Sequence, residues 1–149
     1  MQNGNDSIEI AIEIDLNQIR RIAEKIGPKY DQIKSIYLFG SVARGDADKK
    51  SDIDLFFLVR GKSSDLITIL THDDDYGAFE DWAFEKVEGG VNPIVCNKDE
   101  LINDFSTLTE KILIEGIRLY GQDIKEMQGL IKDKEKENKV NLLDLVRSL

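Results

Sequence analysis

The sequence predicts a single α+β domain of the α/β type, in which short strands alternate along the chain with helices. The length of 149 residues suits one domain with one hydrophobic core. Three apolar runs have the length of buried strands, at residues 33–39, 53–59 and 91–96. The segments between and after these runs repeat their apolar residues at helical spacing.

The N-terminal part is predicted to form an extended segment followed by a helix. Residues 7–14 place isoleucine at every second position from residue 8, which is typical of an edge strand or of an extended arm that pairs with something else. Asp15 is then a suitable N-cap for a helix whose isoleucines recur every three or four residues. Gly27 and Pro28 are expected to end that helix.

Residues 33–39 and 53–59 are predicted to be the central strands, and residues 91–96 a third, shorter strand. The second run is apolar at almost every position, as expected of a strand buried on both faces of its sheet. A carboxylate at the start of such a strand is costly to bury without a partner. Asp54 occupies that position, so we expect it to have a function.

Two further regions have helical spacing. Residues 65–87 form a helical but interrupted pattern. Residues 73–75 are three consecutive aspartates, which we interpret as solvated acids that cap a helix start and not as metal ligands. Another helix is predicted to open at Lys98 and to end at Gly116.

Residues 1–121 are predicted to form the domain, and residues 122–149 a C-terminal helical extension. The apolar residues of the extension have helical spacing around a charged middle at residues 132–139. Such a helix can pack back on the core, or it can dock on a partner chain or a second copy. The spacing does not choose between these interpretations.

The overall composition excludes several classes of function. A net charge of −9 argues against a protein that binds a polynucleotide template, because such proteins neutralise the phosphate backbone with lysine and arginine. The single cysteine, Cys96, lies in an apolar stretch and is expected to be a buried thiol. No apolar run approaches the length of a membrane span, and the N-terminus is unlike a signal peptide. We expect a cytoplasmic protein.

A turn and two carboxylates form the motif that indicates chemistry. Gly40 and Ser41 directly follow the first central strand, and Asp52 and Asp54 come after a spacer of ten residues, 42–51. Because side chains alternate across a strand, Asp52 and Asp54 project from the same face, about 6.5–7 Å apart along it. Paired carboxylates suit Mg²⁺, which binds one or two of them together with substrate phosphates. Glycine lets the backbone of the turn approach a phosphate closely.

This motif resembles that of the nucleotidyltransferase superfamily that includes DNA polymerase β, and more narrowly that of the minimal nucleotidyltransferases. The resemblance implies a polymerase β-like fold, a small mixed sheet flanked by helices. It also implies that Asp52 and Asp54 are catalytic Mg²⁺ ligands and that Gly40 and Ser41 bind the phosphates of a nucleoside triphosphate, with ATP expected. Arg44 either meets those phosphates as well or pairs on the surface with a nearby aspartate.

The resemblance further implies transfer of AMP to an acceptor hydroxyl. Minimal nucleotidyltransferases are often paired with HEPN-type RNase toxins, and some act as antitoxins by adding AMP to a tyrosine of the toxin. A small acceptor of the aminoglycoside type is less suitable, because such enzymes usually carry a second helical domain. The alternative is an antitoxin or regulatory binding module with little or no catalysis.

The third predicted strand departs from the family pattern. Many relatives carry an acid on this strand as general base or further metal ligand, whereas here the matching position is Asn92. An amide cannot take up a proton, although its carbonyl oxygen can face a cation. Glu85 or Glu88 would replace the acid only if the chain brought it to the site. Asn92 is therefore a candidate third-site residue, and it favours the binding-module alternative.

Overall fold

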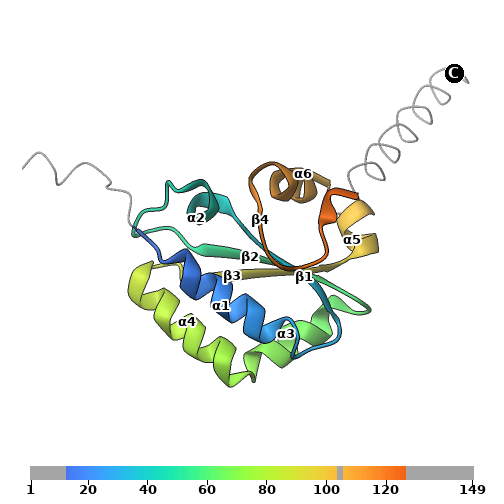
Figure 1. The fold of residues 1–149 in the computed structure, drawn as a ribbon, viewed down its shortest axis with the longest axis horizontal. Coiled ribbons are helices and arrows are strands. Elements are labelled where there is room, and N and C mark those ends of the chain that lie inside the picture. The colour runs from blue at the N-terminus through green and yellow to red at the C-terminus, as the bar shows by residue number, and fades with distance from the viewer. Residues whose placement is uncertain (1–12, 104–105, 127–149) are drawn as a thin grey trace, which may run out of the picture.

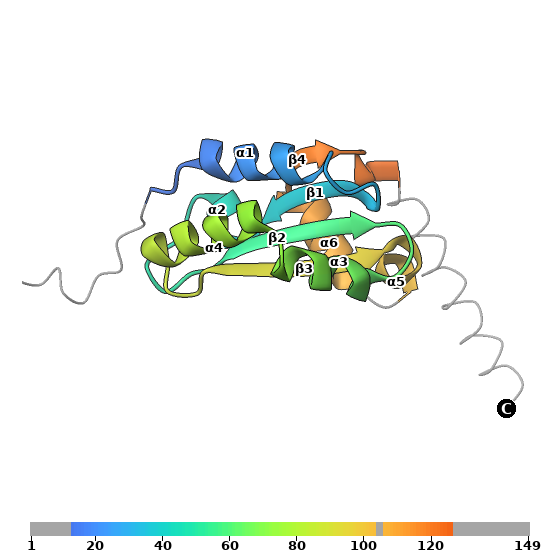
Figure 2. The ribbon, with the colours of Figure 1, turned by 90° about the horizontal axis from the view of Figure 1, so that it is seen from below.

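The computed structural model describes residues 13–103 and 106–126 and places a four-stranded mixed sheet at the centre of the molecule. The strands are β1 (Ile33–Phe39), β2 (Ile53–Val59), β3 (Val91–Asn97) and β4 (Ile117–Gly121). Their order across the sheet is β3-β2-β1-β4, as Figure 2 shows. β1 pairs antiparallel with both β2 and β4, and β2 pairs parallel with β3. The prediction of a small mixed sheet flanked by helices is confirmed.

Helices cover both faces of the sheet (Figure 1). They are α1 (Leu16–Ile26), α2 (Gly40–Arg44), α3 (Ser63–Thr71), α4 (Asp74–Lys86), α5 (Lys98–Asn103) and α6 (Ser106–Glu115), followed by the 3₁₀ turn η2 (Ile124–Glu126). α1, α3 and α4 pack against one face, and α5 and α6 against the other. Among the described helices, none combines the length and the apolar character that crossing a membrane requires.

β2 is buried on both faces, as its apolar sequence predicts. Ile53, Leu55 and Phe57 join the core formed with α1, α3 and α4. Phe56 and Leu58 join the second core, which lies under α5 and α6. Because strand side chains alternate, Asp54 belongs to the face of Phe56 and Leu58, the face that α6 covers.

The predicted helix starts and stops are confirmed on the first face. Asp15 caps α1 by accepting a hydrogen bond from the Asn17 amide at 2.9 Å, and α1 ends before Gly27. The interrupted pattern of residues 65–87 resolves into two helices, α3 and α4. Asp73 caps α4 by accepting from the Tyr76 amide at 2.9 Å, so this aspartate has the capping role expected of it. It is not solvated as expected, because it is buried against Lys29 and Tyr30.

The C-terminal half differs from the expectation in two respects. The single helix predicted after Lys98 is two helices, α5 and α6. Asn97 and Glu100 cap α5 reciprocally, each side chain accepting from the other's backbone amide at 2.9–3.0 Å. The segment that closes the predicted domain forms β4, which pairs along β1 from Leu38 to Ser35. A five-residue edge strand depends on this pairing and has little local signal of its own.

The first residues of the predicted extension pack on the domain. Ser35 donates its hydroxyl to the Gln122 carbonyl at 2.6 Å, and the Tyr37 hydroxyl accepts from the Ile124 amide at 3.1 Å. Ile124 is buried in the core under α5 and α6. Both the helical extension beyond residue 126 and most of the alternating segment at residues 7–14 lie outside the described residues.

Candidate functional site

The turn after β1 brings Gly40 against Asp54. Gly40 has a φ of +76°, in the left-handed region that favours glycine, and opens the short helix α2. A Cβ atom at Gly40 would lie 2.0 Å from Oδ2 of Asp54. Any side chain at this position would therefore have to displace the carboxylate. The glycine turn and the Asp54 carboxylate are therefore in direct contact.

Asp52 and Asp54 occupy the start of β2 at the same end of the sheet. Asp54 pairs in register with Phe39 of β1 on one side and with Asn92 of β3 on the other. Asp52 directly precedes β2, so strand alternation places it on the face of Asp54. A Cβ atom at Gly89 would lie 2.7 Å from that of Asp52, so the turn before β3 packs directly on Asp52. Both carboxylates are half-buried.

Asn92 contacts Asp54 directly. Its Nδ2 donates a hydrogen bond to Oδ1 of Asp54 at 3.0 Å, while its side chain stays exposed to solvent. The parallel pairing of β2 and β3 sets these two residues side by side. Asn92 therefore lies beside Asp54 as a hydrogen-bond donor to that carboxylate.

Burial makes the Asp54 carboxyl unusually hard to ionise. Burial raises the pKa of Asp54 to about 6, the hydrogen bond from Asn92 opposes that rise, and the neighbouring Asp52 carboxylate adds to it. Two acids that resist being charged together fit a site whose carboxylates are neutralised by a cation. Within the described residues, no group of three or more His, Cys, Asp or Glu side chains is placed to share a metal ion. The pair fits Mg²⁺ that is also bound by substrate phosphates.

The Asp54 pKa predicts a specific pH dependence of stability. Because the folded protein holds the Asp54 proton up to about pH 6, whereas an unfolded aspartate releases it near pH 4, the folded state loses stability as pH rises through this window. Asp54→Asn mimics the neutral carboxyl. In metal-free urea unfolding, the variant should match the wild type near pH 4 and be more stable by about 1 kcal/mol at pH 7, after allowing for solvent screening. A difference independent of pH would contradict this prediction.

The remaining predicted residues of the turn are placed as follows. Ser41 is half-buried in α2, and its carbonyl accepts from the amides of Gly45 and Asp46, both at 3.0 Å. Arg44 forms the surface ion pair with Asp46 that was one of the two expectations, at 3.3 Å. It also donates from NH1 to Oε2 of Glu115 at 2.7 Å, and the Glu115 side chain is only 11% exposed.

Two residues of α6 lie near the site although no sequence motif marks them. Glu115 reaches Arg44 across 71 residues of chain. Lys111, one helical turn earlier, exerts its positive charge on Asp54 and lowers the pKa of that carboxyl, against the effect of burial. The only sequence signal is the i, i+4 spacing of Lys111 and Glu115, which is common on exposed helices.

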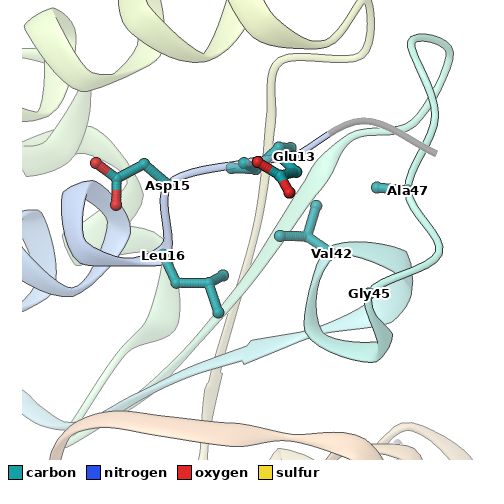
Figure 3. Close-up of a pocket in the computed structure, with 7 residues that line it drawn as sticks. Glu13, Asp15, Leu16, Val42, Gly45 and Ala47 are labelled. Atoms are coloured by element: carbon teal, nitrogen blue, oxygen red, sulfur yellow. The ribbon is translucent and has the colours of Figure 1, made fainter.

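A cavity of about 530 Å³ lies apart from the carboxylates, between the start of α1 and the loop after α2 (Figure 3). Val42 and Ala47 line it from the α2 side, and Leu16 from α1. Glu13 and Asp15 add acidic side chains to its rim. Neither Asp52 nor Asp54 lines this cavity.

Comparisons with known proteins agree with the fold. The sequence model of the family described as "Nucleotidyltransferase domain" matches residues 16–141. No curated protein matches the sequence. Among solved structures, a toxin–antitoxin complex with AMP-PNP is similar, with 16% identity, a TM-score of 0.52, and coverage of 89% of this chain and 99% of that one.

Two further solved structures resemble this chain at similarly low sequence identity. A mutant of the MntA–HpeT toxin–antitoxin complex has 14% identity, a TM-score of 0.50, and coverage of 89% of this chain and 99% of that one. The tri-AMPylated Shewanella oneidensis HEPN toxin in complex with MNT antitoxin has 15% identity, a TM-score of 0.44, and coverage of 87% and 94%. At these identities structural likeness bears on the fold alone, whereas the family match spans most of the sequence. The chain belongs to the nucleotidyltransferase domain family.

Proposed function

We propose that the protein is a Mg²⁺-dependent nucleotidyltransferase that moves AMP from ATP to a hydroxyl group on a partner protein, such as a HEPN-type RNase toxin. The observation that carries the proposal is the contact between the glycine turn and the carboxylates. Gly40 lies directly against Asp54, and Asp52 shares its face. A backbone turn that can approach phosphates is thus held beside two acids that can hold a cation.

The transfer exchanges one phosphorus–oxygen bond for another. The acceptor oxygen bonds to the α-phosphorus, the bond from that phosphorus to the bridging oxygen breaks, and pyrophosphate leaves with the electron pair. The hydroxyl proton passes to solvent. Mg²⁺, when bound by Asp52 and Asp54, supplies positive charge to the phosphates. The residues of the chain position the reactants: Gly40 and Ser41 bind the phosphates, and the rigid start of β2 fixes the two carboxylates.

Three observations support ATP as the nucleotide and a protein as the acceptor. The fold is shared with a toxin–antitoxin complex that contains AMP-PNP, an ATP analogue. The net charge of −9 disfavours a polynucleotide acceptor and is compatible with a protein. The motif also resembles that of minimal nucleotidyltransferases, whose partners are HEPN-type toxins. The proposal places the protein in the cytoplasm, where ATP is available.

A second candidate function is supported by Asn92. In place of a third acid, the chain has an amide that donates a hydrogen bond to Asp54. A protein with this site could mask its partner as an antitoxin or regulatory binding module with little turnover. The transferase would modify its partner covalently and the binding module would only form a complex with it, so one experiment separates them.

The test uses the full chain, Mg²⁺, the purified product of the neighbouring gene and each of the four ribonucleoside triphosphates in labelled form. We expect label from ATP on the neighbouring protein, attached at a tyrosine hydroxyl and mapped by mass spectrometry. Omission of Mg²⁺ should abolish labelling. A stable complex of the two proteins without label would support the binding module and contradict the transferase.

The Asn92→Asp variant tests how the site compensates for the missing acid. A third carboxylate should strengthen cation binding, so we expect transfer to rise several-fold when Mg²⁺ is below saturation. It should also lower the stability of the metal-free protein, because it replaces a hydrogen-bond donor to Asp54 with a like charge. Calorimetric Mg²⁺ titration, thermal unfolding and labelling rates measure the three effects. Weaker Mg²⁺ binding in a folded variant would mean that the site is built around the amide.

A further inference from the structure

Helix α6 lies over the sheet face that carries Asp54. Ile112 is buried against that face, and the Thr109 hydroxyl donates to the Leu101 carbonyl, which ties α6 to α5. α6 leads into β4, whose first residue, Ile117, pairs with Leu38 near the end of β1. The C-terminal half of α6 therefore lies at the same end of the sheet as the glycine turn.

One side of α6 faces the short helix α2. Glu115 contacts Arg44 of α2 at 2.7 Å. Lys111 precedes Glu115 by four residues, so the two side chains leave α6 on the same side, one turn apart. α2 begins at Gly40, which touches Asp54. Lys111 thus shares the side of α6 that faces the turn, and its charge acts on Asp54.

Arg44 and Lys111 differ in whether a carboxylate already pairs with them. The positive charge of Arg44 is balanced, because its guanidinium forms ion pairs with Glu115 and with Asp46. Lys111 is exposed, and in the part of the chain that the structure describes no carboxylate forms an ion pair with it. A triphosphate that enters an acidic site gains most from a cation that has no partner to give up.

We propose that Lys111 is the residue that binds the β- and γ-phosphates of the nucleoside triphosphate and remains with the pyrophosphate as it leaves. Arg44 and Glu115 instead form a structural pair that holds α2 against α6. This assignment rests on the proposed function, since it names the group that recognises the leaving phosphates. An ammonium binds phosphate oxygens as a point charge and needs no fixed planar geometry.

The experiment compares the affinities of ATP and AMP, measured by calorimetry on the full chain with Mg²⁺ and without an acceptor protein. AMP lacks the two phosphates that Lys111 would bind. We expect Lys111→Ala to weaken ATP binding at least about tenfold and to leave AMP binding within about twofold. Lys111→Arg should retain most of the ATP affinity. Lys98→Ala removes an exposed lysine from the neighbouring helix α5 and should behave as the wild type.

The outcomes separate this assignment from the proposed function. Wild-type protein that binds no nucleoside triphosphate overturns both. Wild-type protein that prefers ATP to AMP, with the same preference in Lys111→Ala, overturns the role of Lys111 alone. Loss of the preference in Arg44→Gln but not in Lys111→Ala would transfer the role to Arg44. Thermal unfolding of each variant checks that the fold is retained, and in transfer assays the Lys111→Ala effect should appear in KM more than in kcat.

Discussion

Asp52→Asn is expected to reduce nucleotide transfer about a hundredfold to a thousandfold while the protein remains folded. The variant removes one of the two negative charges that the site offers to a cation, and electrostatic groups of this kind are worth about 10²–10³ in rate each. Asp52 is only half-buried and lies before β2, so it makes little contribution to the core. The initial rate of labelling of the partner protein, at saturating ATP and Mg²⁺, measures the effect.

Asp46→Asn is the matched control. It makes the same change of charge at an exposed aspartate of the spacer, one that only pairs with Arg44 at 3.3 Å. We expect its transfer rate to stay within about twofold of the wild type. Equal loss in both variants would show that net acidity, and not the position of Asp52, supports the reaction. Full activity in a folded Asp52→Asn would place the site elsewhere.

The central strands could be predicted because their signal is local. β1 and β2 have the bounds that their apolar runs predict, and the alternation of β2 places Asp54 on the face opposite Ile53 and Leu55. The contact of Gly40 with Asp54 comes from the antiparallel pairing of β1 and β2, because the turn ends one strand and the aspartate begins its neighbour. Short-range patterns therefore predict the two strands and the face that carries Asp54, and strand pairing supplies the contact.

The surroundings of the site could not be predicted, because they depend on contacts between distant segments. Arg44 and Glu115 meet only after α6 has packed on the sheet. β4 is a strand because β1 offers an unpaired edge at that place, and its five residues show no strong alternation. The hydrogen bond from Asn92 to Asp54 requires the parallel register of β2 and β3, which no residue near either position indicates.

Asp73 joins the turn after α1 to the start of α4 through a buried carboxylate. Its side chain is 3% exposed and accepts hydrogen bonds from Lys29 at 2.8 Å, from the Tyr30 hydroxyl and from the Tyr76 amide. Burial acts to raise the pKa of Asp73, but the bonds from Lys29, Tyr30 and Tyr76 outweigh it and lower the pKa to about 2. The folded protein therefore needs this group in its charged form.

Asp73→Ala is expected to lower the free energy of unfolding at pH 7 by about 2–3 kcal/mol, from the lost helix cap and the lost charged hydrogen bonds. A lowered pKa adds stability that is present above the unfolded value near 4 and is lost as pH falls toward 2. Urea unfolding from pH 7 to pH 2.5 should therefore show the difference between wild type and Asp73→Asn shrinking as pH falls. Asp75→Asn, which removes an exposed partner of the same Lys29, should cost clearly less. Equal costs for Asp73→Asn and Asp75→Asn, or a difference that grows in acid, would show that Asp73 is not the charged group that joins the turn after α1 to α4.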